Sequence, residues 1–427
     1  MKKPISSKNR EKILNQIHHL DSRLILNIIP KSIKVQTTIT SPPYFDIKDY
    51  GAENQVGYGQ NYDAYLDDLK TIFEKVFQIT KNDGTLWIII DTLKRNNQVV
   101  TLPFDLANTL KKVGWLFQDI IIWKKDKTVP WSTNGFVQRK FEYILFFSKS
   151  ITYKNNKDKV RVFDTTLLKK WWVKYPERYN PKGKALDEIW EFPIPIQGSW
   201  GDEYIRHFCP LPKELVATMI QISTDEYDVV LDPFAGSGTV LSQSAYMKRK
   251  YIGFELNKEY IEMFNNYINK TLPKFRKEYE LLEQNDDQNH FESQILDLRA
   301  LKFGRVIINN LEKITNRNDL KIFVSIIGKS KQKNKSIIVE YTIIGNFDEN
   351  EIELLAQIKN IISKPPLSKF GIEPKFEFIE KKMFDTKKFF GYSKTNTYSY
   401  KKDIELNSNK IKVISNIKVD LNEKDYN

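Results

Sequence analysis

The chain has 427 residues, of which 41% are hydrophobic and 28% charged, so it is long enough for two or three domains with a large core. A net charge of +13 favours a polyanionic partner such as nucleic acid. A single cysteine, Cys209, excludes a disulfide framework, and with only four histidines the chain offers no zinc-type ligand cluster. We therefore name no metal ligands, although carboxylates alone could still hold magnesium.

The sequence also gives no sign of a membrane segment. No run approaches the ~18 apolar residues that cross a bilayer, and residues 1–11 are polar without the apolar core of a signal peptide. We expect a cytoplasmic protein with no membrane partner.

A short apolar strand is predicted over Ile33–Ile39, and it ends at Thr40-Ser41-Pro42-Pro43-Tyr44. Prolines cannot donate ladder hydrogen bonds, so the chain leaves the sheet here, and their fixed φ sets the directions of the neighbouring carbonyls. A hydroxyl precedes the pair and an aromatic ring follows it. We call Ser41–Tyr44 the proline turn; an isolated Pro-Pro pair most often marks only a rigid turn.

Helices and strands alternate after this turn. The apolar spacing predicts helices over 65–80 and 103–113, the first closed by Asn82-Asp83-Gly84, and strands over 85–90, 115–123 and 141–147. This alternation indicates a mostly parallel α/β sheet. Residues 150–200 break the pattern with tryptophans, prolines and basic residues, which favours either an irregular insertion or a nucleic-acid contact region.

Regular structure returns with a helix over 211–222 and a strand over 228–231. The glycine loop then follows, Asp232-Pro233-Phe234-Ala235-Gly236-Ser237-Gly238-Thr239, and leads into a helix. A strand over 251–254 ends at Glu255, and a helix is predicted over 259–269. The two glycines of the glycine loop let its backbone approach a ligand closely, and Glu255 can accept hydrogen bonds from ribose hydroxyls. Without a third glycine or Gly-Lys-Thr, the loop favours a nucleoside lacking a pyrophosphate; a Rossmann-like turn for another ligand is the alternative.

Taken together, the two motifs resemble the β-group DNA amino-methyltransferases, in which the catalytic motif precedes the cofactor motif. Thr40–Tyr44 resembles the (D/N/S)-P-P-(Y/F) motif, and Val230–Val240 resembles the D-P-F-x-G-S-G-T loop. His207–Leu215 resembles the segment that holds the methionine moiety of the cofactor, and Leu20-Asp21-Ser22 resembles a G-D-S element. Residues 121–124 and 141–149 resemble later strands, so the resemblance covers about residues 15–275.

This resemblance implies an α/β, Rossmann-like S-adenosylmethionine methyltransferase fold with permuted motif order. The implied domains are a catalytic half (1–150), a target-recognition region (151–200) and a cofactor-binding half (201–280), which leaves residues 281–427 as a C-terminal accessory domain of unknown role. The implied catalytic residues are Ser41, Pro42, Pro43 and Tyr44. The implied cofactor-binding residues are Asp21, His207, Pro212, Asp232, Pro233, Phe234, Ala235, Gly236, Ser237, Gly238, Thr239 and Glu255.

By the same resemblance, Ser41 Oγ and the Pro42 carbonyl accept the two hydrogens of the target amine, and Tyr44 stacks on a base flipped out of duplex DNA. Serine at the first motif position goes mostly with cytosine in this family. We therefore predict site-specific methylation of the 4-amino group of cytosine with S-adenosylmethionine, in a restriction-modification system. The 6-amino group of adenine is the alternative, and a cognate restriction endonuclease could be a further partner.

Two other classes stay open from the residues. One is a catalytically inactive nucleic-acid-binding protein on the same fold, and the other is a methyltransferase for RNA or a small molecule; the Trp-rich insertion favours DNA. Residues 281–427 lie outside the resemblance, and strands predicted over 336–344, 376–379 and 411–419 with a helix over 351–361 indicate a small α+β domain. Its lysines favour a further DNA-contacting module. The acids around Lys375 leave a fused nuclease as the lesser alternative.

Overall fold

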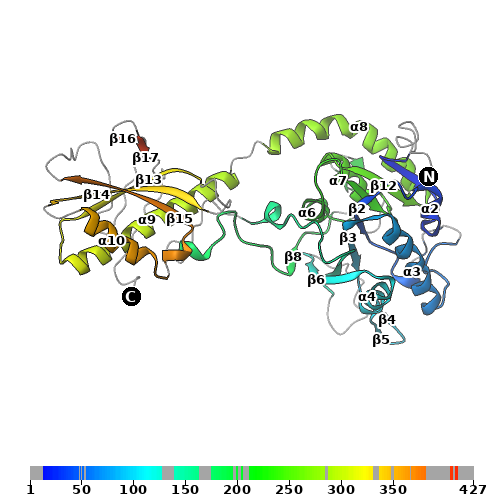
Figure 1. Ribbon diagram of the computed structural model, residues 1–427. Helices are drawn as coiled ribbons and strands as arrows, with labels where there is room; N and C mark the ends of the chain where they lie inside the picture. Colours follow the sequence, from blue (N-terminus) through cyan, green and yellow to red (C-terminus); the bar gives the residue numbers. More distant parts are fainter. Residues whose placement is uncertain are drawn as a thin grey trace. The chain divides into compact units, whose positions relative to one another are not determined.

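The chain folds into two compact units. The computed structural model describes residues 13–47, 49, 51, 54–126, 139–162, 175–195, 199–200, 203–204, 211–283, 287–329, 336–347, 351–365, 367–380, 404–406 and 409–411. The first unit comprises Met1–Arg161 and Ala185–Asn285, and the second comprises Val162–Lys184 and Asp286–Asn427 (Figure 1).

An eight-stranded sheet forms the centre of the first unit, in the order β1-β12-β11-β2-β3-β7-β6-β8. Its strands are β1 (Gln16–His19), β2 (Val35–Thr40), β3 (Thr80–Ile90), β6 (Leu116–Lys124), β7 (Phe141–Ser148), β8 (Ile189–Glu191), β11 (Val229–Asp232) and β12 (Lys250–Glu255). All neighbours from β1 to β3 pair in parallel, whereas β7 is antiparallel to both β3 and β6. The predicted mostly parallel α/β sheet of Rossmann-like type is confirmed.

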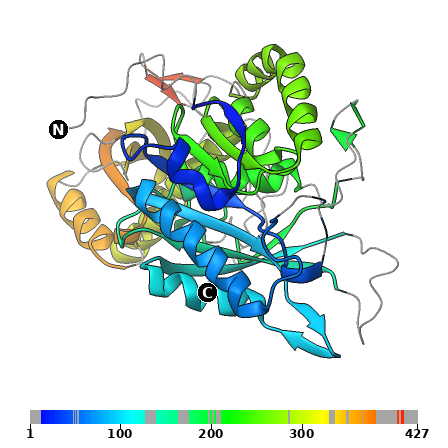
Figure 2. The ribbon, with the colours of Figure 1, turned by 90° about the vertical axis from the view of Figure 1, so that its right-hand side faces the viewer.

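Helices cover both faces of this sheet (Figure 2). The helices α2 (Ile25–Ile28), α3 (Tyr62–Ile79) and α4 (Leu102–Val113) pack on one face; α6 (Lys213–Ser223) and α7 (Thr239–Tyr246) pack on the other, and α8 (Lys258–Glu283) packs beside α7. Along β3, Leu86 and Ile88 pack into the core on the side of α3 and α4, and Trp87 packs into the core on the side of α6. Each of the three is at most 2% exposed. Burial on both faces explains the continuous apolar run of this strand.

The junction between α3 and β3 differs from the prediction. The sequence predicts that Asn82-Asp83-Gly84 closes the helix, but α3 ends at Ile79 and these residues belong to β3. A Cβ on Gly84 would lie 2.4 Å from Thr80 Cγ2 and 2.9 Å from the Gln36 carbonyl oxygen. The glycine therefore serves the close approach of β3 to β2, and not a helix end.

Short elements complete the first unit. They are the hairpin β4 (Leu93–Arg95) and β5 (Gln98–Val100), the pair β9 (Ser199–Trp200) and β10 (Glu203–Tyr204), and the 3-10 helices η1 (Ser22–Leu24), η2 (Phe45–Ile47) and η3 (Lys157–Val160). Among the helices that the structure describes, none is long and apolar enough to cross a membrane.

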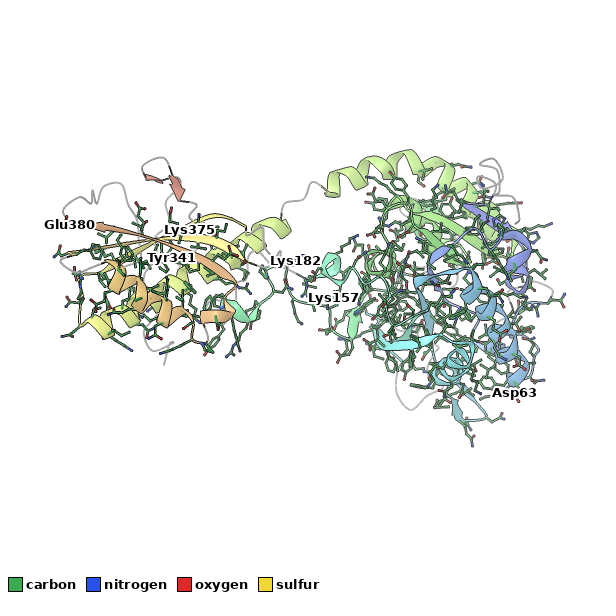
Figure 3. All side chains as sticks on the ribbon, viewed as in Figure 1. Asp63, Lys157, Lys182, Tyr341, Lys375 and Glu380 are labelled. Carbon is green, nitrogen blue, oxygen red and sulfur yellow. The ribbon has the colours of Figure 1, made fainter. Side chains whose placement is uncertain are left out.

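The second unit contains the predicted small α+β fold. Its sheet has the order β13 (Lys321–Lys329), β14 (Ile337–Gly345) and β15 (Ile372–Glu380), with α9 (Asp287–Thr315) and α10 (Glu351–Ile362) packed on one face. Tyr341 lies in this core and donates a 3.0 Å hydrogen bond to the Ala300 carbonyl (Figure 3). The 3-10 helix η5 (Leu367–Lys369) and the hairpin β16 (Ile404–Leu406) and β17 (Asn409–Ile411) complete it; of the strand predicted over 411–419, residues 412–419 lie outside the described residues.

Part of the irregular insertion folds with the second unit. Around η4 (Pro176–Arg178), the Arg299 guanidinium of α9 donates to the carbonyls of Pro176 (3.0 Å) and Tyr179. Lys302 forms an ion pair with Glu177, and Tyr179 packs against the core of the second unit. A β-bridge joins Val162 and Lys184, the two ends of the part of the insertion that belongs to the second unit.

Candidate active site

The proline turn and the glycine loop follow neighbouring strands of the sheet. Because β2 and β11 pair in parallel, their carboxyl ends meet at the same edge, where ligands bind in open α/β sheets. Thr40, the last residue of β2, donates a 2.7 Å hydrogen bond from Oγ1 to Asp232 Oδ1, the last residue of β11. The two motifs, widely separated in the chain, are thus joined directly.

Asp232 is the buried anchor of the glycine loop. Its side chain is 3% exposed, and Oδ1 also accepts from the Phe234 backbone N–H at 3.0 Å. Burial raises the pKa of this carboxyl from 3.8 to about 7, although both hydrogen bonds oppose the shift. Asp232 therefore fixes the start of the glycine loop through its hydrogen bonds to Thr40 and Phe234.

The glycine loop owes its path to two residues with positive φ. Gly236 has φ +52° and Gly238 has φ +83°, and a Cβ on Gly238 would lie 2.3 Å from the Phe264 ring. The Ala235 N–H donates to the Phe254 carbonyl at 2.9 Å, which ties the loop to β12. The loop then enters α7 at Thr239.

Glu255 ends β12 beside this loop. Its Oε2 accepts from the Gly236 N–H, and its Oε1 accepts from the N–H groups of Leu256 and Asn257, each at 2.8 Å. Burial raises the pKa of this carboxyl, while these three hydrogen bonds lower it. Since a carboxylate has about four lone-pair positions, Oε2 keeps one for a ligand hydroxyl. A carboxylate held in this way beside two glycines fits a nucleoside.

The two proline carbonyls of the turn differ in their surroundings. The Pro43 carbonyl accepts from the Tyr65 hydroxyl at 2.6 Å and from the Phe45 N–H at 3.0 Å. Among the described residues, none donates to the Pro42 carbonyl. Of the two proline carbonyls, that of buried Pro42 is thus the one without a donor among the described residues.

Tyr44 is held at its hydroxyl end. Oη donates to Glu142 Oε2 at 2.8 Å and accepts from Ser41 Oγ at 3.3 Å. The other carboxylate oxygen of Glu142 forms an ion pair with Lys125. Burial and the neighbouring Glu142 raise the pKa of Tyr44 well above 10, so its hydroxyl keeps its proton.

The remaining predicted ligand residues occupy different places. The Asp21 carboxylate caps η1 and pairs with Arg23 at 2.6 Å, while its neighbour Ser22 donates to the Pro233 carbonyl of the glycine loop. Pro212 is buried at the start of α6. His207 lies outside the described residues.

Sequence reasoning did not assign roles to three residues that contact the site: Ser22, Tyr65 and Glu142. Ser22 and Glu142 stand inside segments that resemble family elements, which is the only signal the sequence carried. Tyr65 appeared as one apolar position of a helix. Within the described ranges, no group of three or more His, Cys, Asp or Glu side chains could hold a metal ion.

A mostly parallel sheet with a glycine loop and a proline turn at adjacent strand ends defines an α/β enzyme that binds a nucleoside cofactor. The family model described as DNA methylase matches residues 35–266, more than half of the chain, and the chain belongs to this family. A second model, the D12 class N6 adenine-specific DNA methyltransferases, matches residues 213–362.

The chain is similar to several methyltransferases of known sequence or structure. The Type II methyltransferase M.Cfr9I of Citrobacter freundii is 28% identical over 278 residues, which cover 58% of this chain and 85% of that protein. The orphan methyltransferase M.BamHII of Bacillus amyloliquefaciens is 30% identical over 264 residues, which cover 55% of this chain and 90% of that protein. A solved structure, the putative DNA modification methylase of Thermus thermophilus complexed with S-adenosyl-L-methionine, is 25% identical with a TM-score of 0.42, covering 60% of this chain and 94% of that one.

The protein is therefore an S-adenosylmethionine-dependent DNA methyltransferase of the restriction-modification type, acting on an exocyclic amine of cytosine or adenine. The predicted enzyme class, methyl donor and DNA substrate are confirmed. The choice of cytosine stays a prediction.

Proposed function

We propose that this protein methylates the 4-amino group of cytosine at a specific sequence in duplex DNA. Ser41 Oγ and the Pro42 carbonyl accept the two amino hydrogens, and Tyr44 stacks on the flipped base. The observation that supports this role most directly is the contrast between the two proline carbonyls. Tyr65 and Phe45 donate to the Pro43 carbonyl, whereas no described residue donates to the Pro42 carbonyl, which is thus left for a substrate donor.

The chemistry needs no covalent enzyme intermediate. Two hydrogen bonds pull the amine toward tetrahedral geometry and expose its lone pair. Bound S-adenosylmethionine supplies an electrophilic methyl group on a sulfonium. Held by Ser41 and Pro42, the amine nitrogen would form its bond to the methyl carbon as the carbon–sulfur bond breaks, and the amine proton would leave to solvent. Pro43 keeps the turn rigid during this step, because its carbonyl accepts a hydrogen bond from the Tyr65 hydroxyl.

The cofactor residues have matching roles in this proposal. The free position on Glu255 Oε2 accepts from a ribose hydroxyl, and the backbone of Gly236–Gly238 passes close to the ligand. Asp232 with Thr239 fixes the loop, and Pro233, Phe234, Ala235 and Ser237 shape it. Asp21, His207 and Pro212 are proposed to contact the adenine and methionine ends.

Two groups of variants test these roles. Tyr44→Ala, Pro42→Ala and Ser41→Ala should each lose most methyl transfer to duplex DNA while keeping cofactor affinity, measured by calorimetry. Pro42→Ala is informative because the turn loses its fixed φ but keeps its carbonyl. Full activity in all three variants would overturn the assignment of the proline turn.

The target base has two candidates. Serine at position 41 favours cytosine through the family pattern, while the match of residues 213–362 to an adenine-specific model favours the 6-amino group of adenine. DNA methylated in vitro, digested to nucleosides and separated by mass, distinguishes them. Only N4-methylcytosine supports our proposal, and only N6-methyladenine replaces it.

We assign recognition of the target sequence to residues 151–200 together with the second unit. Residues 176–179 of this region contact α9 of that unit through Arg299. The second unit holds 31 lysines and arginines against 22 aspartates and glutamates, so it carries +9 of the net charge of +13. Such an excess suits phosphate contacts, which weaken steeply with salt.

A cognate restriction endonuclease and a cytoplasmic location complete the proposal, because M.Cfr9I and M.XycI are named as Type II methyltransferases. Extracts of cells that contain this protein should cleave unmodified DNA, and treatment of that DNA with the purified protein should prevent cleavage. Cleavage that ignores such treatment would contradict the pairing.

A further inference from the structure

A chain of polar contacts runs away from the proline turn toward β6 and β7. Ser41 Oγ lies 3.3 Å from Tyr44 Oη, and Tyr44 Oη lies 2.8 Å from Glu142 Oε2. Lys125, next to β6, forms an ion pair with Glu142 Oε1. The Glu142 and Lys125 side chains are only 15% and 17% exposed, so water offers little competition for these contacts.

The direction of each hydrogen bond in this chain is fixed. A carboxylate only accepts hydrogen bonds, so the single hydroxyl proton of Tyr44 is donated to Glu142 and stays on Tyr44. Tyr44 Oη can then only accept from Ser41, and the single proton of Ser41 is used there. Ser41 Oγ consequently has lone pairs, and no proton, left for a substrate.

We propose that Glu142 is a positioning residue that acts through Tyr44 to turn the Ser41 hydroxyl proton away from the target amine. This inference rests on the proposed role of Ser41 as an acceptor. A serine hydroxyl is otherwise free to rotate, and a proton aimed at the amine would oppose an N–H donor. Glu142 thereby selects the one rotamer of the hydroxyl that is productive.

Glu142→Gln tests this polarity because it keeps the shape of the side chain. Lys125 donates to the amide oxygen, which leaves the NH₂ group facing Tyr44 Oη as a donor. The Tyr44 proton must then point to Ser41, and the Ser41 proton points to the substrate. The whole chain reverses, whereas Tyr44→Phe merely releases the Ser41 hydroxyl to rotate.

The experiment compares single-turnover methyl transfer in Glu142→Gln, Tyr44→Phe and the double variant, on a duplex that carries the site found by sequencing modified bases. We expect Glu142→Gln to be about 10- to 100-fold slower, which corresponds to one opposed buried hydrogen bond. Tyr44→Phe should be only about threefold slower, since one released hydroxyl costs less than a reversed one. The double variant should match Tyr44→Phe.

Two further measurements separate positioning from damage to the fold. Cofactor affinity by calorimetry, and flipping reported by 2-aminopurine at the target position, should be unchanged in Glu142→Gln. Glu74→Gln is the matched control because Glu74 forms an exposed pair with Lys70 on α3, at 3.6 Å. It should react at the wild-type rate.

The outcomes are distinguishable from failure of the proposed function. A Glu142→Gln variant within twofold of wild type, or one equally impaired with and without the Tyr44 hydroxyl, overturns the inference. If Ser41→Ala is slow at the same time, the role of Ser41 stands and only the role of Glu142 fails. If Ser41→Ala is fully active, the proposed function itself fails.

Discussion

Thr40 Oγ1 donates a 2.7 Å hydrogen bond to Asp232 Oδ1 and so couples the strand before the proline turn to the glycine loop. Both side chains are buried, at 0% and 3% exposed. A shift of either strand end would break this bond and leave a buried carboxylate with one donor fewer. The relative placement of the two motifs therefore depends on this contact.

Thr40→Val should lower the free energy of unfolding by about 1–3 kcal/mol, the usual cost of removing a partner from a buried polar group. The control is Thr38→Val on the same strand. Thr38 Oγ1 is also buried but has no hydrogen-bond partner among the described residues, so this substitution should be neutral or stabilising. Urea unfolding measures both, and equal losses would contradict the role of the bond.

Asp232 predicts an unusual dependence of stability on pH. Its folded pKa of about 7 lies above the usual 3.8, so between these values the native state holds a proton that the unfolded chain has released. Its contribution is complete below about pH 4, decreases as the pH rises to about 7 and stays low above it. The full difference is about 4 kcal/mol at 1.36 kcal/mol per pKa unit.

Asp232→Asn isolates this effect. Thr40 and the Phe234 N–H both donate to Asp232 Oδ1, so the amide oxygen of asparagine can retain both hydrogen bonds. The urea midpoint of wild type minus that of the variant should fall between about pH 4 and 7. Fluorescence suits this measurement because six of the eight tryptophans belong to the first unit. A difference that is constant with pH would refute the raised pKa.

The placement of the two motifs could be predicted from the sequence because each is local. Proline ends a strand and glycine permits a tight loop whatever lies nearby, and adjacent parallel strands bring their carboxyl ends together. Contacts from distant segments left no comparable pattern. Glu142 and Tyr65 occupy positions whose spacing indicates only strand and helix, and the Arg299 guanidinium binds backbone carbonyls, which any sequence provides.

Tyr65→Phe should slow methyl transfer by about threefold to tenfold, because the Pro43 carbonyl loses one of two donors and the turn loses rigidity. Tyr62→Phe is the control on the same helix, because the Tyr62 hydroxyl donates to Asp105 of α4 at 2.9 Å and not to the turn. Single-turnover rates are the measurement. Similar rates in the two variants would show that the bond to Pro43 does not govern the turn.

The backbone of Gly57 lies close to Phe45, the residue after the proline turn, so we expect a side chain at position 57 to disturb the turn. Gly57 has φ +100°, and a Cβ there would lie 2.7 Å from the Phe45 carbonyl oxygen. Gly59 has φ +71° but no atom within 4 Å of such a Cβ. Both alanine variants should lose about 1 kcal/mol for the left-handed backbone. Only Gly57→Ala should also lose most methyl transfer, so equal activity would exclude the steric link.

The contacts of Arg299 lead us to predict that residues 175–180 and α9 act together in DNA binding. Arg299 bonds to the carbonyls around η4, and Arg299→Met removes these donors while keeping much of the side-chain volume. Amide exchange over residues 175–180 should then rise, and so should trypsin cleavage at exposed Arg178. Affinity for duplex DNA should fall while cofactor affinity is unchanged. Lys313→Met, at an exposed position of the same helix, serves as the control. Unchanged DNA affinity with raised exchange would remove residues 175–180 from the recognition surface.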